Sequence, residues 1–149
     1  MRKTLGYMVT WTTYGTWLRG DNRGWREDGK TYEANPQLKQ IDESQMKGEI
    51  IRLNSKEKAI VREAICKKAE SLGQTVFAIL VWSSHIHVVV GYDGRRIEET
   101  VRIYKNAATA ALRKTGLTGK VWGGGFDKQF CFDEQSLRNR VKYVEGHGA

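Results

Sequence analysis

Two of the three histidines in this 149-residue chain, His85 and His87, are separated by a single aliphatic residue. They lie within SSHIHVVV (83–90), a run whose β-branched residues are typical of a strand. Because side chains alternate faces along a strand, both imidazoles are expected on one face, about 7 Å apart along the backbone. Two imidazoles in this arrangement can bind one metal ion. The pattern is equally typical of strand histidines whose hydrogen bonds are purely structural.

A tyrosine and the third histidine lie near the C-terminus. Asp133 is expected to begin a helix there, with an apolar stripe at Leu137, Val141 and Val144. Tyr143 and His147 are four residues apart and therefore share one flank of this helix. A phenol can act as a nucleophile and an imidazole as a metal ligand. A tyrosine at such a position is often only a packing residue, and a histidine this close to the chain end often belongs to a frayed terminus.

The order of the other elements predicts an α+β fold. Strands are expected at 5–14, 75–83, 85–90 and 126–132, and helices at 55–72 and 96–115. The order βαββαβ is that of the ferredoxin-like, or RRM-like, four-stranded antiparallel sheet, here with an added C-terminal helix. The first and third strands are central in this topology. The histidine pair is therefore expected in mid-sheet, on the face away from the packed helices, where the C-terminal helix can approach it.

We expect a single domain, 1–149, with a loop-rich insertion at about 19–54 that is polar and unusually long for a connection in a small domain. Within the insertion, cationic side chains alternate with an aromatic ring at Arg19, Arg23, Trp25 and Arg26. This composition is used to hold single-stranded bases and phosphates. The candidate contacts to nucleic acid are Arg19, Arg23 and Trp25 in the insertion, Arg102 and Lys105 on the helix at 96–115, and Lys142 beside Tyr143. A tryptophan that pins the loop and solvated basic helix faces would explain these residues equally well.

The formal net charge is +8 and the isoelectric point is near 9.6, which suits a polyanionic partner. Residues 95–149 hold much of the excess, with 11 Lys and Arg against 6 Asp and Glu. No apolar run is long enough to span a bilayer and no signal peptide is evident, so we expect no membrane partner and a cytoplasmic location. Cys66 and Cys131 lack metal-binding spacing and are expected to be buried free thiols.

Three stretches together resemble a known family. TYGTWLRGDNRGW (13–25), VWSSHIHVVV (81–90) and SLRNRVKYVEGHG (136–148) are similar to the single-tyrosine HUH transposases (IS200-like), and most of all to the REP-associated tyrosine transposases. The His–hydrophobic–His signature alone is a weak signal. The ordered set of three stretches on a ferredoxin-like order of elements is considerably more specific, and the resemblance spans nearly the whole chain.

The resemblance implies a metal-dependent endonuclease and strand transferase that acts on single-stranded DNA, often beside hairpins at repeat ends, in DNA transposition. It assigns His85 and His87 as ligands of Mg²⁺ or Mn²⁺, and Tyr143 as the nucleophile that becomes joined to a 5′-phosphate. His147 stands where the family often has Asn or Gln as a third ligand, and such a histidine-rich set favours Mn²⁺. The family's common arrangement implies a homodimer, with Tyr143 acting in its own or in the partner's site.

The chain departs from the family pattern at two places. Trp82-Ser83-Ser84 replaces a common Met-Pro-Asn before His85, and Gly146-His147 replaces the usual ending after the nucleophile. An alternative function is a non-catalytic module that binds single-stranded nucleic acid on an RRM-like sheet, with Tyr143 and the tryptophans stacking on bases. A replication or mobilisation nuclease is a third interpretation, disfavoured because no helicase or second domain is evident. Tyr104 is a competing nucleophile, although its place on an apolar helix stripe indicates a core residue.

Overall fold

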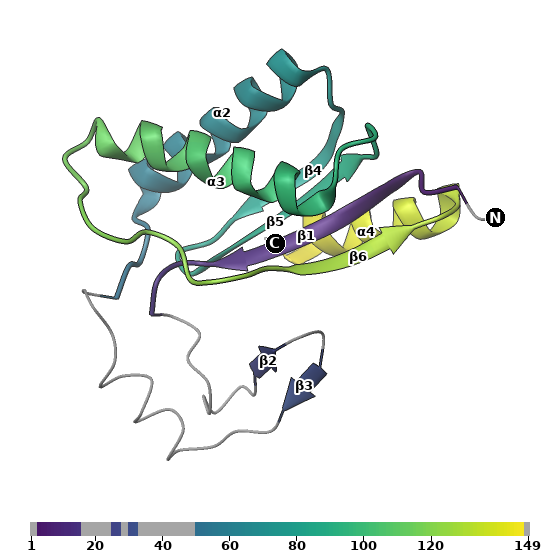
Figure 1. Cartoon of the computed structure of the whole chain (residues 1–149), viewed down its shortest axis with the longest axis horizontal. Helices are drawn as coiled ribbons and strands as arrows, with labels where there is room; N and C mark the ends of the chain where they lie inside the picture. Colours follow the sequence, from purple (N-terminus) through teal and green to yellow (C-terminus); the bar gives the residue numbers. More distant parts are fainter. Residues whose placement is uncertain (1–2, 16–24, 28–29, 33–49, 148–149) are drawn as a thin grey trace.

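The computed structural model describes residues 3–15, 25–27, 30–32 and 50–147 (Figure 1). A four-stranded antiparallel sheet in the order β4-β5-β1-β6 forms its centre. The strands are β1 (Gly6–Thr12), β4 (Val76–Val81), β5 (His85–Gly91) and β6 (Asp127–Cys131). A separate two-stranded sheet consists of β2 (Trp25–Glu27) and β3 (Lys30–Tyr32).

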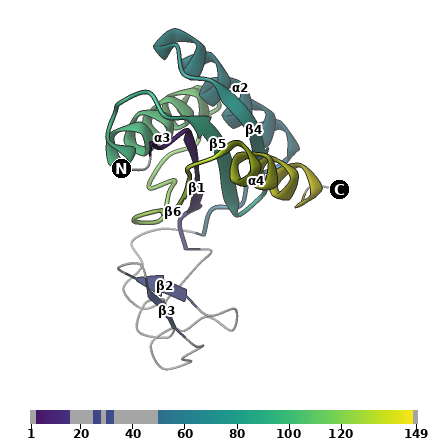
Figure 2. The same ribbon diagram turned by 90° about the vertical axis from the view of Figure 1, so that its right-hand side faces the viewer.

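In the described part of the chain, three helices cover the two faces of the sheet. The helices α2 (Ser55–Leu72) and α3 (Ile97–Arg113) lie together on one side, and α4 (Glu134–His147) lies on the other (Figure 2). Each strand contributes side chains to both faces of the sheet, because successive side chains point in opposite directions. In β1, Tyr7, Val9 and Trp11 enter the large core under α2 and α3, whereas Met8 joins a smaller core under α4.

The predicted order βαββαβ with an added C-terminal helix is confirmed, and β1 and β5 are the two central strands. Helix α2 spans the range predicted for it, 55–72. The N-cap is Asn54, whose side chain accepts a hydrogen bond from the Glu57 amide while the Glu57 carboxylate accepts one from the Asn54 amide. This reciprocal capping box satisfies two amides at the helix start.

Residues that precede the predicted insertion are joined at the sheet to a residue near its end. The Ile51 amide donates to the Tyr14 carbonyl at 2.9 Å, and the Thr13 hydroxyl donates to the Ile51 carbonyl at 2.6 Å. Leu53 is buried in the large core. The chain therefore leaves the sheet after β1 and returns to almost the same point before α2.

Cys131 is buried and Cys66 is partly buried, and both are free thiols, as predicted. Among the described residues, no helix has the length and apolar content required to cross a bilayer.

Candidate active site

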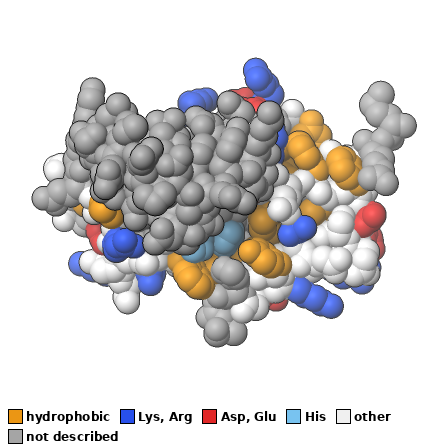
Figure 3. Space-filling view, turned by 90° about the horizontal axis from the view of Figure 1, so that it is seen from below, with side chains coloured by type: hydrophobic (Ala, Val, Ile, Leu, Met, Phe, Trp, Pro, Cys, Tyr) orange, Lys and Arg blue, Asp and Glu red, His pale blue; other side chains and the backbone are white. Residues whose placement is uncertain are grey.

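His85 and His87 project from the α4 side of the central strand β5. They alternate with Ile86, Val88 and Val90, which lie in the large core on the other side of the sheet. The two imidazole rings have centroids 4.9 Å apart and planes at 75°. The strand period has therefore placed both rings side by side, as the sequence predicted. Figure 3 shows histidine side chains at the surface beside hydrophobic groups.

His87 is held by a residue from the neighbouring strand. Antiparallel pairing of β1 with β5 sets Thr10 directly opposite His87. The Thr10 Oγ1 atom lies 2.7 Å from His87 Nδ1, a short hydrogen bond between side chains that are 77 positions apart in the sequence. Only 7% of the His87 side chain is exposed, so the ring has little freedom to rotate.

His85 is more open and has different neighbours. Its Nδ1 atom lies 3.2 Å from the Ser84 hydroxyl oxygen. The indole of Trp82 lies 5.0 Å from the His85 ring, centroid to centroid, with the planes tilted by 35°. The Trp82 amide donates to the His85 carbonyl, which closes the tight turn between β4 and β5. The exposed Trp82 ring therefore forms the rim of the histidine pair.

Tyr143 reaches the same place from α4. Its ring centroid lies 5.9 Å from that of His87 with an interplanar angle of 81°, an edge-to-face contact. The residue remains 45% exposed. The predicted nucleophile and the predicted ligand pair are thus brought together, although 56 residues separate Tyr143 from His87 in the chain.

The small core under α4 fixes the position of this tyrosine. Val144, the next residue, is buried against Met8, Ala78 and Val89 from three different strands. At the other end of the helix, the Asp133 carboxylate accepts a hydrogen bond from the Ser136 amide at 2.7 Å, the capping role predicted for Asp133. Burial of Val144 and the cap together determine which flank of α4 faces the histidines.

The donor set suits a divalent cation. Two imidazoles on one strand face, each with a hydroxyl at Nδ1, could coordinate a cation through Nε2, and as nitrogen donors they are softer than Mg²⁺ prefers, which favours Mn²⁺. Within the described residues, no group of three or more His, Cys, Asp or Glu side chains could hold a metal ion. His147 ends α4, and its side chain lies outside the described part of the chain. Its role as a third ligand stays a prediction.

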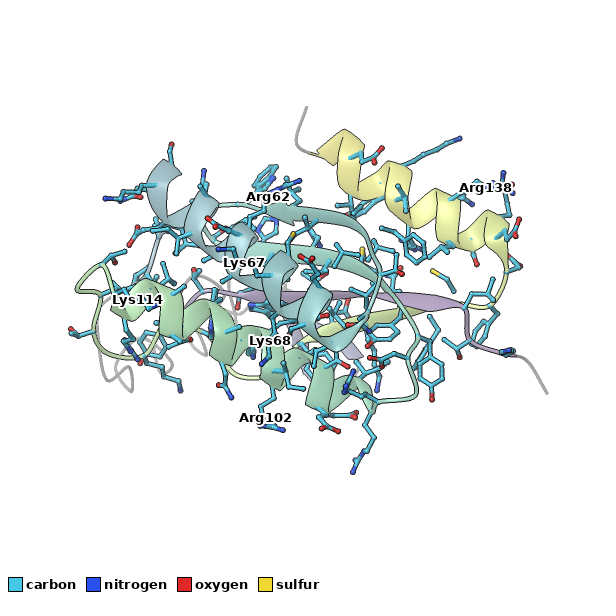
Figure 4. The ribbon with its side chains drawn as sticks, turned by 90° about the horizontal axis from the view of Figure 1, so that it is seen from above. Arg62, Lys67, Lys68, Arg102, Lys114 and Arg138 are labelled. Carbon is cyan, nitrogen blue, oxygen red and sulfur yellow. The ribbon has the colours of Figure 1, made fainter. Side chains whose placement is uncertain are left out.

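The predicted DNA contacts that the structure describes lie on both sides of the sheet. Lys142 is exposed on α4 beside Tyr143. Arg102 is exposed on α3, in the helical layer that also carries Lys67 and Lys68 (Figure 4), across the sheet from the histidines. Arg19 and Arg23 lie outside the described residues, as does the side chain of Trp25 at the start of β2.

Lys105 is directed toward the backbone of the loop before β6. Its ammonium group donates to the carbonyls of Gly125 at 2.9 Å and Gly123 at 3.4 Å. Burial, together with the charge of Lys120, lowers the pKa of the Lys105 ammonium below its ordinary value. These contacts give Lys105 a structural function in α3, on the face of the sheet opposite Tyr143.

Tyr104 is a core residue, as its apolar stripe indicated. Its side chain is fully buried, and its hydroxyl donates a hydrogen bond to the side-chain oxygen of Gln74. Burial raises the pKa of the Tyr104 phenol well above its ordinary value, which disfavours the phenolate needed for nucleophilic attack. Among the described tyrosines, the one that lies against the histidine pair is Tyr143.

The chain therefore has a ferredoxin-like α+β architecture. One face of its sheet carries the imidazole pair, and helix α4, which carries Tyr143, is docked on that face. The structure of a REP-associated tyrosine transposase bound to a REP hairpin matches it with a TM-score of 0.59 and 15% identity, over 99% of this chain and 72% of that one. At this identity the likeness shows a shared fold, and it confirms the resemblance found in the sequence at that level.

A second solved structure, assigned as a transposase from Deinococcus radiodurans, matches with a TM-score of 0.48 and 12% identity, over 98% of this chain and 92% of that one. No family model and no curated protein matches the sequence.

The sequence did not single out Thr10 or identify Trp82 as part of the site. The available signal for Thr10 was a polar residue on a predicted central strand. Its partner, His87, becomes evident only from the register of the two strands. Trp82 lies only three residues before His85, at the predicted turn between two strands, and this proximity could have identified it.

Proposed function

We propose that this protein is a metal-dependent endonuclease and strand transferase for single-stranded DNA, of the single-tyrosine HUH kind, acting in transposition or on repeat hairpins. One observation carries the proposal. A half-exposed tyrosine lies 5.9 Å, ring to ring, from a histidine that itself lies 4.9 Å from a second histidine. The structural neighbour bound to a REP hairpin supports a DNA substrate of this type.

His85 and His87 would hold the divalent cation, with His147 as the expected third ligand. The cation would neutralise charge on the non-bridging oxygens of the scissile phosphate. The chain's own residues position the reacting groups, since β5 fixes the imidazoles and α4 fixes the phenol. Lys142, exposed beside Tyr143, would contact a neighbouring phosphate.

Tyr143 would attack the phosphorus through its phenolic oxygen. A bond forms between Oη and phosphorus, the bond from phosphorus to O3′ breaks, and the electron pair leaves with O3′. The phenol proton passes to solvent, which reaches the half-exposed ring, and the leaving oxygen takes up a proton to become a 3′-hydroxyl. The product is a 5′-phosphotyrosine that retains one phosphodiester bond, so a second 3′-hydroxyl can reverse the step without ATP.

A binding module is the second candidate, because Trp82 and Tyr143 expose 37% and 45% of their surface on this side of the sheet. Rings of this kind stack on unpaired bases. Such a module would need the ring of Tyr143 and would not need its hydroxyl. Substitution of Tyr143 by phenylalanine therefore separates the two functions.

The decisive experiment uses end-labelled single-stranded hairpins, taken from repeats beside the gene, on a denaturing gel. Wild type should form a protein–DNA adduct with Mn²⁺ and none with EDTA. Tyr143→Phe and the double variant His85→Ala/His87→Ala should form none while still binding DNA. Tyr104→Phe is the matched control and should leave the adduct intact. Tight hairpin binding by wild type without any adduct in Mn²⁺ or Mg²⁺ would establish the binding module instead.

A further inference from the structure

The hydrogen bond between Thr10 and His87 carries information about the proton on the imidazole. A neutral histidine has one protonated and one unprotonated ring nitrogen, and only the unprotonated one can bind a cation. The partner of the first nitrogen therefore selects the nitrogen that remains for the metal. Thr10 Oγ1 is hydrogen-bonded to His87 Nδ1, so this hydroxyl influences which nitrogen of the His87 ring carries the proton.

The hydroxyl of Thr10 can either accept from Nδ1 or donate to it. Acceptance places the proton on Nδ1 and leaves the lone pair on Nε2, whereas donation does the reverse. The charge around Thr10 favours acceptance. The register of β1 with β6 sets Asp127 directly opposite Thr10, on the side away from His87. Cross-strand neighbours have Cβ atoms about 5 Å apart, so the negative charge on β6 favours a Thr10 hydroxyl hydrogen that points toward that strand and away from the imidazole.

Asp127, Thr10 and His87 thus form one row across three strands, and all three belong to the sheet face under α4. We propose that Thr10 is a positioning residue that fixes His87 in the Nδ1–H tautomer and so presents Nε2 for the cation, with Asp127 orienting the Thr10 hydroxyl. This inference rests on the proposed function and extends it from the two ligands to the residues behind one of them. Ser84 would have the corresponding, weaker contact at His85, where its hydroxyl lies at 3.2 Å.

The first test reads the tautomer without any metal. Nitrogen-15 NMR on metal-free protein labelled in histidine, recorded about two units above the ordinary imidazole pKa of about 6.5, distinguishes protonated from unprotonated ring nitrogens. Wild-type His87 should carry its proton on Nδ1. In Thr10→Val, which keeps the side-chain shape and removes the hydroxyl, both tautomers should appear, and Thr10→Ser should restore the wild-type spectrum. Asp127→Ala should weaken the preference.

The second test measures Mn²⁺ binding by calorimetry. Loss of an outer-shell hydrogen bond typically weakens metal binding by about 10- to 100-fold, which we expect for Thr10→Val. Thr10→Ser should recover most of this loss. Thr12→Val is the matched control because Thr12 pairs with His85 on the same strand face and has no such bond to its partner's ring in the described structure. It should bind Mn²⁺ as wild type does.

Wild-type His87 protonated on Nε2, or equal Mn²⁺ affinity in Thr10→Val and wild type, would overturn the inference. The wild-type spectrum alone decides it if Thr10→Val fails to fold. The proposed function fails separately. If His85→Ala/His87→Ala binds Mn²⁺ as tightly as wild type, the pair is not the metal site, while the tautomer spectrum still decides whether Thr10 sets the proton on His87.

Discussion

Replacement of Val144 by alanine is expected to loosen the C-terminal helix without loosening the rest of the domain. Val144 is buried in the small core, where Met8, Ala78 and Val89 are the other buried members. Loss of two methyl groups costs about 1.6 kcal/mol in transfer free energy, at about 0.8 kcal/mol each. A residual cavity of about 40 Å³ would add about 1 kcal/mol. A total near 2.5 kcal/mol corresponds to about a 60-fold larger undocked population.

Hydrogen exchange followed at individual amides measures this population. Amides of α4 should exchange about 60-fold faster in Val144→Ala if the helix opens as a unit of its own. Val88→Ala is the matched control. It removes the same two methyl groups from a fully buried valine in the large core on the other side of the sheet. That variant should accelerate exchange in β5 and leave exchange in α4 unchanged.

Equal acceleration of α4 exchange by both variants would refute this reasoning. It would mean that the helix separates only when the whole domain unfolds, so that the two cores form a single cooperative unit. No change in α4 exchange in Val144→Ala would show instead that the cap and exposed contacts hold the helix, and that the buried valine contributes little.

Lys142→Met should lower the slope of log affinity for hairpin DNA against log salt by about one, whereas Lys105→Met should leave the slope unchanged because its ammonium is engaged by backbone carbonyls. Tyr104 has a raised pKa in the folded protein, so its contribution to stability is present below pH 10 and is lost as the pH rises above it. In Tyr104→Phe, the free energy of unfolding from urea titrations should therefore fall less between pH 9 and 11 than in wild type. Gly6→Ala would place a Cβ atom 2.5 Å from a carbonyl oxygen of β5 and should lower the melting temperature sharply, while Gly124→Ala, with open space around it, should not.

The fold could be read from the sequence because its signals are local. Apolar stripes at helical spacing and β-branched runs located α2, β5 and α4 to within a few residues. The cap of α2 is also a local feature, since Asn54 and Glu57 have the spacing of a capping box. The order of elements then limited the topology, and the position of His85 and His87 on a central strand followed from that topology.

The surroundings of the site could not be read in this way because they depend on contacts between distant segments. The pairing of Thr10 with His87 requires the exact register of two strands, and a shift of one residue would turn the hydroxyl to the other face. The direction of Lys105 depends on the path of a glycine-rich loop that periodicity does not describe. Of the residues chosen for charge that the structure describes, Arg102 and Lys105 therefore lie on the α3 side of the sheet and Lys142 on the α4 side.

The histidine pair and Tyr143 are held with unequal firmness, and this bears on how the proposed site would work. The histidines lie on a central strand that is paired on both sides, and Thr10 fixes one ring. Tyr143 lies on a helix docked through a small core, with one end capped by Asp133. A strand-transfer reaction requires the phosphate contacts to stay in place while the tyrosine, once joined to DNA, meets a different 3′-hydroxyl. The sheet would keep the phosphate contacts fixed, and the helix docked through a small core would let the tyrosine move. Motion of α4 leaves the strand pairing around His85 and His87 intact.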